Sequence, residues 1–320
     1  MFRRQVYMTY KEALFNPSIP FNAIIENQTM PKYLYKYQCF YSEKLLENKF
    51  WKENIKGCFH LSLGSEFEDK NDCRPYFNKK KIIKMLCDYL KSSKQLSEEQ
   101  IKKVLTQINN ELKPEYFERV AMNYQNQIRI GCFTKSSDNN AMWEKYSNKE
   151  TGFCIEYETY KNQLFMHSTL PVLYLETPYD ISLSLVSHIL INSYQKAHNL
   201  SDEEKNKRFE QIHKKSLKVG YMPIFIKEKK KWSFEQEYRM FLLKNRNTAI
   251  GKLKAEEILD EKSNIDLSNA ITAIYLGARF DENKNYDEIK EKVIQIVQSM
   301  KIKLFRKRYK DGLYVNERII

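Results

Sequence analysis

The sequence is poor in glycine and proline, the residues that mark tight turns and flexible linkers. Its 320 residues include 8 Gly and 8 Pro, which excludes a collagen-like or linker-dominated chain and argues against a glycine-rich nucleotide-binding loop. No apolar run approaches the length of a membrane span, and residues 1–14 lack the apolar core of a signal peptide. We therefore expect a cytoplasmic protein without a membrane partner.

Patterns of metal ligands are also missing. No two of the 6 cysteines form a CxxC pair, and the 5 histidines form neither an HxxxH nor an HxH pair. This spacing fits neither a zinc site nor the disulfide framework of a small secreted domain. We predict reduced thiols and no bound metal.

Aromatic residues and positive charge are abundant. The 22 Tyr and 18 Phe are enough for a packed core and argue against a disordered chain. The formal net charge of +13 favours polyanionic partners such as RNA, DNA or a phosphate-bearing cofactor. Much of the lysine alternates with glutamate on predicted helices, which is also the pattern of an ordinary solvated surface. Both interpretations stay open at this point.

Predicted strands and helices interleave without regular β–α–β alternation. Alternating apolar residues predict strands over residues 31–41, 57–63, 128–134, 152–158, 171–175, 234–243 and 270–277. Helical spacing predicts short helices over 42–51, 138–146 (with Asp138 as N-cap) and 286–300. A terminal hairpin is expected over 302–309 and 313–318, around Asp311-Gly312. We therefore expect an α+β fold with a mixed or antiparallel sheet at its core.

Two longer segments are predicted to be helical insertions. They cover residues 79–125 and 180–219, and each contains a capping box, Ser97 with Gln100 in the first and Ser201 with Glu204 in the second. We predict one α+β domain over residues 1–320, with these insertions covering its sheet.

The predicted strand 234–243 carries the charge pattern best suited to chemistry. Glu235, Glu237 and Arg239 alternate along it, so they would share one face of a strand. Such a set of carboxylates can stabilise a developing cation, such as the oxocarbenium ion formed when a glycosidic bond breaks. The competing interpretation is an exposed strand face on which Arg239 pairs with a glutamate, since surface ion pairs are common and usually inert.

Five sequence blocks occur in an order that resembles a bacterial family of unknown function, domain-of-unknown-function family 2971. The blocks are Leu34-Tyr35-Lys36-Tyr37, Cys132-Phe133-Thr134, Met142-Trp143-xx-Tyr146, Gly152-Phe153-Cys154-Ile155-Glu156 and Lys231-Trp232-xx-Glu235-x-Glu237-x-Arg239. The resemblance spans about residues 31–277, and its most specific parts are the MWxxY–GFCIE and WxxExExR blocks. The family usually has an FNDPFE-like stretch after its second strand, and residues 67–72 (FEDKND) depart from it.

The resemblance implies a function and a set of site residues. Members of the family look like neighbours of phage-defence genes. Their layout resembles that of ADP-ribosyltransferases, which cleave the nicotinamide–ribose bond of NAD. Carried over, Glu237 would stabilise the oxocarbenium ion and Glu235 would orient the acceptor. Arg239, the third charge on the predicted strand face, is a further catalytic candidate. The NAD-binding residues implied are Tyr35 or Lys36 and Ser62. His60 lies two residues before Ser62, on the same face of the predicted strand, and is a further candidate for binding NAD. The arginine or histidine usual in the first motif is absent from residues 33–37.

Three functions stay open. The first is an NAD-dependent, ADP-ribosyltransferase-like toxin or anti-phage effector with a protein or nucleic-acid acceptor. The second is a nucleic-acid-binding or nucleic-acid-processing defence protein that works through basic surfaces such as residues 229–231, with Glu235 and Glu237 as metal ligands or structural ion pairs. The third is a non-catalytic interaction subunit of a defence or toxin–antitoxin system. Trp143 and Tyr146, three residues apart on a predicted helix, are expected to pack in the core.

Overall fold

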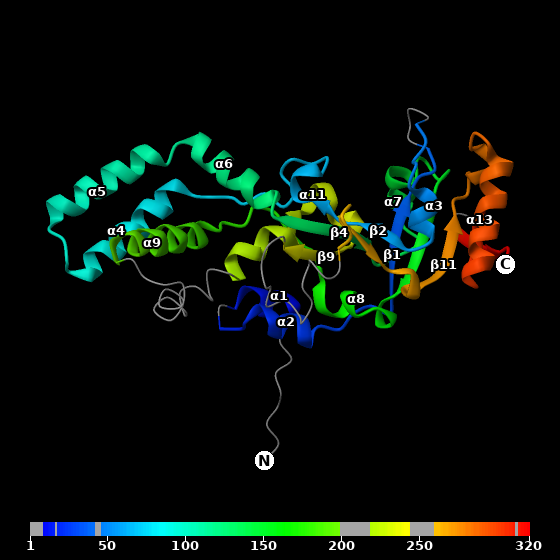
Figure 1. The fold of residues 1–320 in the computed structure, drawn as a ribbon, viewed down its shortest axis with the longest axis horizontal. Helices are drawn as coiled ribbons and strands as arrows, with labels where there is room; N and C mark the ends of the chain where they lie inside the picture. The colour runs from blue at the N-terminus through cyan, green and yellow to red at the C-terminus, as the bar shows by residue number, and fades with distance from the viewer. Residues whose placement is uncertain (1–8, 17, 42–45, 199–217, 244–258, 311–312) are drawn as a thin grey trace, which may run out of the picture. The chain divides into compact units, whose positions relative to one another are not determined.

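The computed structural model describes residues 9–16, 18–41, 46–198, 218–243, 259–310 and 313–320 (Figure 1). The chain folds into two compact units, and each is built from three separate stretches of sequence. Unit 1 consists of Met1–Ile24, Leu63–Ile128 and Leu173–Glu228, and unit 2 of Ile25–Ser62, Arg129–Val172 and Lys229–Ile320. Helices dominate unit 1, and the main sheet lies almost wholly in unit 2. The predicted α+β class is confirmed.

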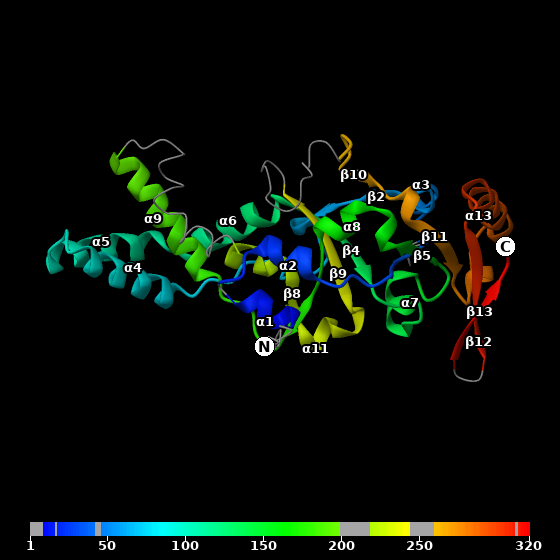
Figure 2. The same ribbon diagram turned by 90° about the horizontal axis from the view of Figure 1, so that it is seen from below.

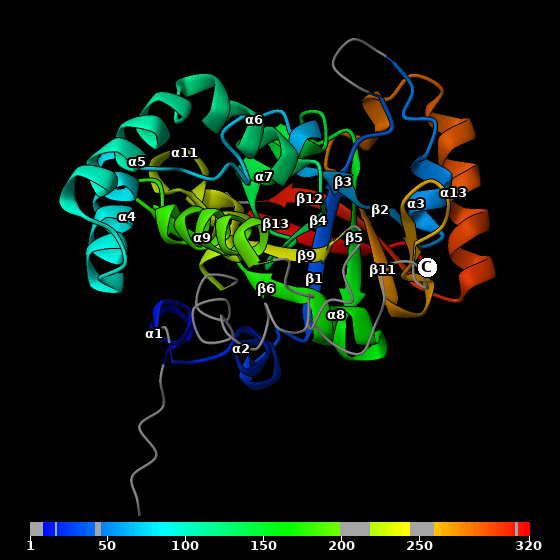
Figure 3. The ribbon, with the colours of Figure 1, turned by 60° about the vertical axis from the view of Figure 1, so that its left-hand side comes forward.

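The main sheet has 9 strands in the order β13-β12-β11-β5-β1-β4-β9-β6, with β3 pairing β4 (Figure 3). The strands are β1 (Tyr33–Gln38), β3 (Ser62–Leu63), β4 (Ile128–Thr134), β5 (Phe153–Glu158), β6 (Thr169–Pro171), β9 (Glu237–Leu243), β11 (Ile271–Leu276), β12 (Lys303–Lys310) and β13 (Leu313–Arg318). β11 and β12 run parallel, whereas β5 runs antiparallel to both β1 and β11. The sheet is therefore mixed, as predicted.

One face of the sheet is buried in the larger apolar core of unit 2. Alternate residues of the central strands point to that face, among them Leu34, Ile155 and Met240. Three helices pack against it, α3 (Trp51–Ile55), α8 (Gln163–Ser168) and α13 (Tyr286–Met300). Figure 3 shows α13 alongside α3 and β11. We call the other side of the sheet the polar face, because it carries the charged residues described below.

The polar face has a smaller aromatic core. Helix α7 (Asn140–Tyr146) places Met142 and Trp143 against Tyr37 and Tyr275 of the sheet. The Trp143 ring is fully buried and meets the Tyr37 ring edge-on, 4.9 Å between centroids, and its indole Nε1 donates to the Ser137 carbonyl. The predicted core position of Trp143 is confirmed.

The terminal hairpin is also confirmed. β12 and β13 pair antiparallel from Phe305 opposite Arg318 to Lys310 opposite Leu313, and Figure 2 shows this pair at one end of the sheet. The predicted turn at residues 311–312 lies outside the described residues. Lys307 points to the polar face, is fully buried, and forms an ion pair with Asp138.

Unit 1 contains the helices of the predicted insertions. These are α4 (Lys79–Ser93), α5 (Glu98–Glu111), α6 (Pro114–Gln125) and α9 (Ser182–His198). The Ser97–Gln100 capping box is present at the start of α5, whereas Ser201 and Glu204 lie outside the described residues. A short parallel pair, β7 (Leu173–Leu175) and β8 (Ile226–Glu228), also belongs to the unit, together with α1 (Tyr10–Phe15) and the first residues of α2 (Phe21–Asn27).

A buried lysine of unit 1 forms hydrogen bonds with the main chain at and after the first N-terminal helix. Lys218 donates to the carbonyl oxygens of Ala13, Asn16 and Ile19 at 2.7, 2.6 and 2.8 Å. Three acceptors satisfy the three donors of an ammonium group. Lys218 is thereby satisfied by main-chain partners, which gives it a structural role.

Two predicted strands are each divided in the structure, because the chain changes its pairing strand within the predicted segment. The strand predicted over 57–63 is two strands: β2 (Cys58–His60) pairs with β10 (Asn264–Asp266), and β3 pairs with β4. The strand predicted over 171–175 is likewise divided between β6, which pairs with β9, and β7, which pairs with β8.

Two predicted helix starts are also wrong. The helix expected over 42–51 is not found over its described residues 46–50, and a helix instead occupies Trp51–Ile55. Residues 42–45 lie outside the described residues. The cap expected at Asp138 is Asn139, whose side chain accepts from the Met142 N–H. Asp138 is instead the partner of Lys307.

Candidate active site

The Glu235–Glu237 segment is a turn followed by a strand. Ser233–Glu235 forms a single 3₁₀ turn, Gln236 adopts the left-handed conformation (φ 46°, ψ 49°), and β9 begins at Glu237. The expectation that all three charged residues alternate along one strand is therefore wrong for Glu235. Both carboxylates are nonetheless buried, with Glu235 3% and Glu237 4% exposed.

Glu237 and Arg239 form a buried, bidentate ion pair. Arg239 Nε donates to Glu237 Oε1 at 2.8 Å, and Nη2 donates to Oε2 at 3.1 Å. Arg239 is fully buried, so the interpretation as an exposed strand face is wrong. Both residues point away from the core side occupied by Met240 and so belong to the polar face. Two parallel charge-assisted hydrogen bonds fix the orientation of this carboxylate.

Side chains from β4 and α7 hold the turn that contains Glu235. The Tyr146 hydroxyl donates to Glu235 Oε1. Thr134 Oγ1 donates to the Glu235 carbonyl at 2.6 Å, and Asn139 Nδ2 donates to the Phe234 carbonyl at 2.5 Å. Tyr146 packs against the aromatic core, as expected, but its hydroxyl reaches the candidate carboxylate.

A third carboxylate, Glu156 on β5, was missed by the sequence reasoning. It accepts hydrogen bonds from the Tyr35 hydroxyl at 3.1 Å, the Tyr275 hydroxyl at 2.8 Å and Thr272 Oγ1 at 2.6 Å. In the sheet register, Tyr35 lies opposite Glu156 on one side and Thr134 on the other. Tyr35 therefore stands between the Glu156 network and the threonine that holds Glu235.

The other candidates for NAD binding are dispersed. Lys36 points to the opposite face of the sheet from Tyr35, with its Nζ 5.5 Å from the Phe59 ring centroid. Ser62 is half-buried on β3, which pairs β4. His60 is exposed on β2, in a separate sheet, with Nδ1 3.1 Å from Asn264 Oδ1. The expectation that His60 and Ser62 share one strand is wrong, and Tyr35 rather than Lys36 shares a face with Glu237.

The two phenols that bind Glu156 resist ionisation. Burial raises the pKa of Tyr35 and of Tyr275 above the ordinary value of 10.0, and the Glu156 carboxylate adds to the effect. Above pH 10 the unfolded chain releases these protons while the folded chain keeps them. The stabilisation from these phenols is therefore complete below pH 10 and decreases as the pH rises further.

A Tyr35→Phe, Tyr275→Phe double variant should accordingly lose less of its free energy of unfolding above pH 10 than the wild-type protein. Urea unfolding at several alkaline pH values measures this slope. Tyr309, which is 61% exposed, provides the control, and Tyr309→Phe should follow the wild type. If the free energy of unfolding of the double variant falls with pH as steeply as that of the wild type, the two phenols do not resist ionisation in the folded protein.

Neither a metal-binding cluster nor a membrane-spanning helix is found among the described residues. No group of three or more His, Cys, Asp or Glu side chains within them is arranged to hold a metal ion. In the same part of the chain, no helix has both the length and the apolar character needed to cross a bilayer.

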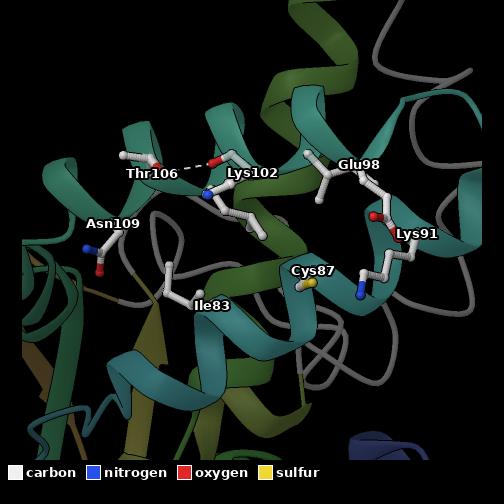
Figure 4. Close-up of a pocket in the computed structure, with 9 residues that line it drawn as sticks. Ile83, Cys87, Lys91, Glu98, Lys102, Thr106 and Asn109 are labelled. Atoms are coloured by element: carbon white, nitrogen blue, oxygen red, sulfur yellow. Dashed lines mark hydrogen bonds between the residues drawn. The ribbon is translucent and has the colours of Figure 1, made fainter.

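Unit 1 has a separate depression between α4 and α5 (Figure 4). It has a volume of about 450 Å³ and combines apolar residues, including Ile83 and Leu105, with Lys91, Glu98 and Lys102. The Thr106 hydroxyl at its wall donates to the Lys102 carbonyl of its own helix. None of the residues predicted for the active site lines this depression.

Comparison with known proteins places the specific motifs in one family. A family described as "Protein of unknown function (DUF2971)" matches residues 142–240, a segment that contains both the MWxxY–GFCIE and the WxxExExR blocks. The resemblance is thus confirmed over these residues. No curated protein and no solved structure gives a significant match to the chain.

Proposed function

We propose that the cluster around Glu237 is the active site of an ADP-ribosyltransferase-like enzyme that uses NAD and acts inside the cell as a toxin or anti-phage effector. The observation that carries the proposal is the burial of both Glu235 and Glu237. Taking carboxylates out of water is costly even when they are paired, and strongly desolvated charged groups concentrate at functional sites. An inert ion pair could stay at the surface, without the burial of two carboxylates.

The chemistry follows from the position of each charge. When the bond between nicotinamide and ribose C1′ breaks, its electron pair leaves with nicotinamide and the ribosyl group becomes cationic. The Glu237 carboxylate, oriented by Arg239, stabilises that cation, because electrostatic attraction is stronger where water is excluded. Glu235 accepts the proton that the acceptor loses as its new bond to C1′ forms.

The turn that carries Glu235 reaches the surface. Ser233 and Gln236 are exposed on either side of Glu235, and Phe234 and Tyr146 beside it are half-buried. Aromatic rings of this kind can stack on nicotinamide or adenine. Tyr35, on the same sheet face, borders the NAD site in this proposal.

Binding of NAD should raise the melting temperature of the wild-type protein. A ligand at a hundred times its dissociation constant stabilises the folded state by about 2.7 kcal/mol. A Tyr146→Ala variant, which loses the aromatic wall beside Glu235, should show a smaller shift, whereas Tyr309→Ala, far along the terminal hairpin, should match the wild type. Absence of any shift with NAD in the wild-type protein would contradict the proposal.

A further inference from the structure

A basic and aromatic surface lies beside Glu235. We call it the Lys145–Trp232 patch. Its cations are Lys145 on α7 and the three consecutive lysines of α11 (Lys229–Trp232), and all four lysines are exposed. Its rings are Tyr146, Trp232 and Phe234. The two helices carry labels in Figure 2. The patch lies wholly within unit 2.

Two of the lysine ammonium groups lie close to the same indole ring, that of Trp232. Lys145 Nζ lies 3.7 Å and Lys231 Nζ 4.7 Å from the Trp232 ring centroid. The two ammonium groups are therefore closer together than about 10 Å, the Debye length at 0.1 M salt, so salt screens their repulsion only partly. Both positive charges are therefore presented at the same part of the surface. Lys145 Nζ also lies 5.3 Å from the Tyr146 centroid and 5.9 Å from that of Phe234.

We propose that the Lys145–Trp232 patch binds single-stranded nucleic acid. Phosphates of the strand pair with the lysines, and bases stack on the half-buried rings of Tyr146 and Phe234. This combination of a positively charged track with aromatic side chains is how proteins hold single strands, because every base presents a π-face for stacking. A duplex hides those faces, and the four-residue α11 is too short to act as a recognition helix in a major groove.

The patch also leads to the candidate active site. Tyr146, which follows Lys145 on α7, donates its hydroxyl to Glu235 Oε1, and Phe234 directly precedes Glu235. A nucleic-acid strand bound to the patch therefore passes next to Glu235, the carboxylate that we propose acts on the acceptor. Binding itself requires no NAD, so this inference and the proposed enzymatic activity can fail independently.

The test is the affinity for a short oligo-dT strand, measured by fluorescence anisotropy without NAD over a range of salt concentrations. Changing Lys145, Lys229, Lys230 and Lys231 together to Gln should weaken binding at least about tenfold at moderate salt. It should also reduce the slope of log affinity against log salt by about 3, since each phosphate contact contributes about 0.7 for single strands. Phe234→Ala should weaken binding about tenfold with an unchanged salt slope.

The matched control removes the same charge elsewhere on unit 2. Lys284, Lys290, Lys303 and Lys310 are exposed, and changing all four to Gln should leave most of the affinity and the slope in place. Thermal melting checks that each variant is folded. Equal losses in the two quadruple variants would overturn the proposal. Equally tight binding of a duplex of the same length, or of vesicles of anionic lipid, would also overturn it.

Discussion

Glu237→Gln should slow the release of nicotinamide from NAD by two to three decades. Gln keeps the shape of the side chain and one acceptor but removes the negative charge. Since this also leaves the buried Arg239 without its counter-charge, the rate is compared at a temperature at which thermal melting shows both proteins folded. Loss of one preorganised electrostatic group at a reacting centre costs about 2.7–4 kcal/mol of transition-state stabilisation. The rate is measured on purified protein by separating nicotinamide from NAD, and expression of the variant in cells should no longer be toxic.

The control for this change is Glu288→Gln on α13. Glu288 is exposed and pairs with Lys292 one helical turn away, so its loss should change neither the rate nor, by more than about 0.5 kcal/mol, the stability. Full activity of Glu237→Gln at normal protein levels would remove the basis for a transferase and make the nucleic-acid surface the leading function.

Removing Arg239 should strongly reduce stability. Arg239→Met leaves the Glu237 carboxylate buried without its bidentate partner, and breaking a buried ion pair in this way costs about 3–5 kcal/mol. The melting temperature should fall by roughly 10 °C. Lys292→Met, which breaks an exposed pair on α13, is the comparison and should cost less than about 1 kcal/mol. A similarly small loss for Arg239→Met would show that the pair is not buried in solution.

A double variant separates stability from function. Glu237→Gln with Arg239→Met removes both charges, so no uncompensated charge stays buried, and replacement of a buried pair by neutral groups is often close to neutral for stability. We therefore expect the double variant to melt higher than Arg239→Met alone. Its activity should stay as low as that of Glu237→Gln, because the missing carboxylate is the cause of that loss.

Much of the secondary structure could be predicted because local patterns determine it. The strand over 128–134 and the helix over 286–300 end where their periodicity ends. The inward positions Met240 and Leu242 also follow from alternation.

The electrostatics of the site could not be predicted in the same way. The alternation of Glu235, Glu237 and Arg239 gave no sign of Gln236, whose left-handed backbone interrupts the strand. Burial of these charges depends on segments far away in sequence, such as Thr134 and Tyr146. The role of Glu156 depends on strand register, which places hydroxyls of β1 and β11 on either side of it.

The most direct test of the account is nicotinamide release from NAD by the wild-type protein and by the Glu237→Gln, Arg239→Met double variant, both assayed below their melting temperatures. We predict release by the wild type that exceeds that of the double variant by two to three decades. Equal release by the two folded proteins, or no release by the wild type in the presence of bound NAD, would contradict the assignment of Glu237 as a catalytic carboxylate.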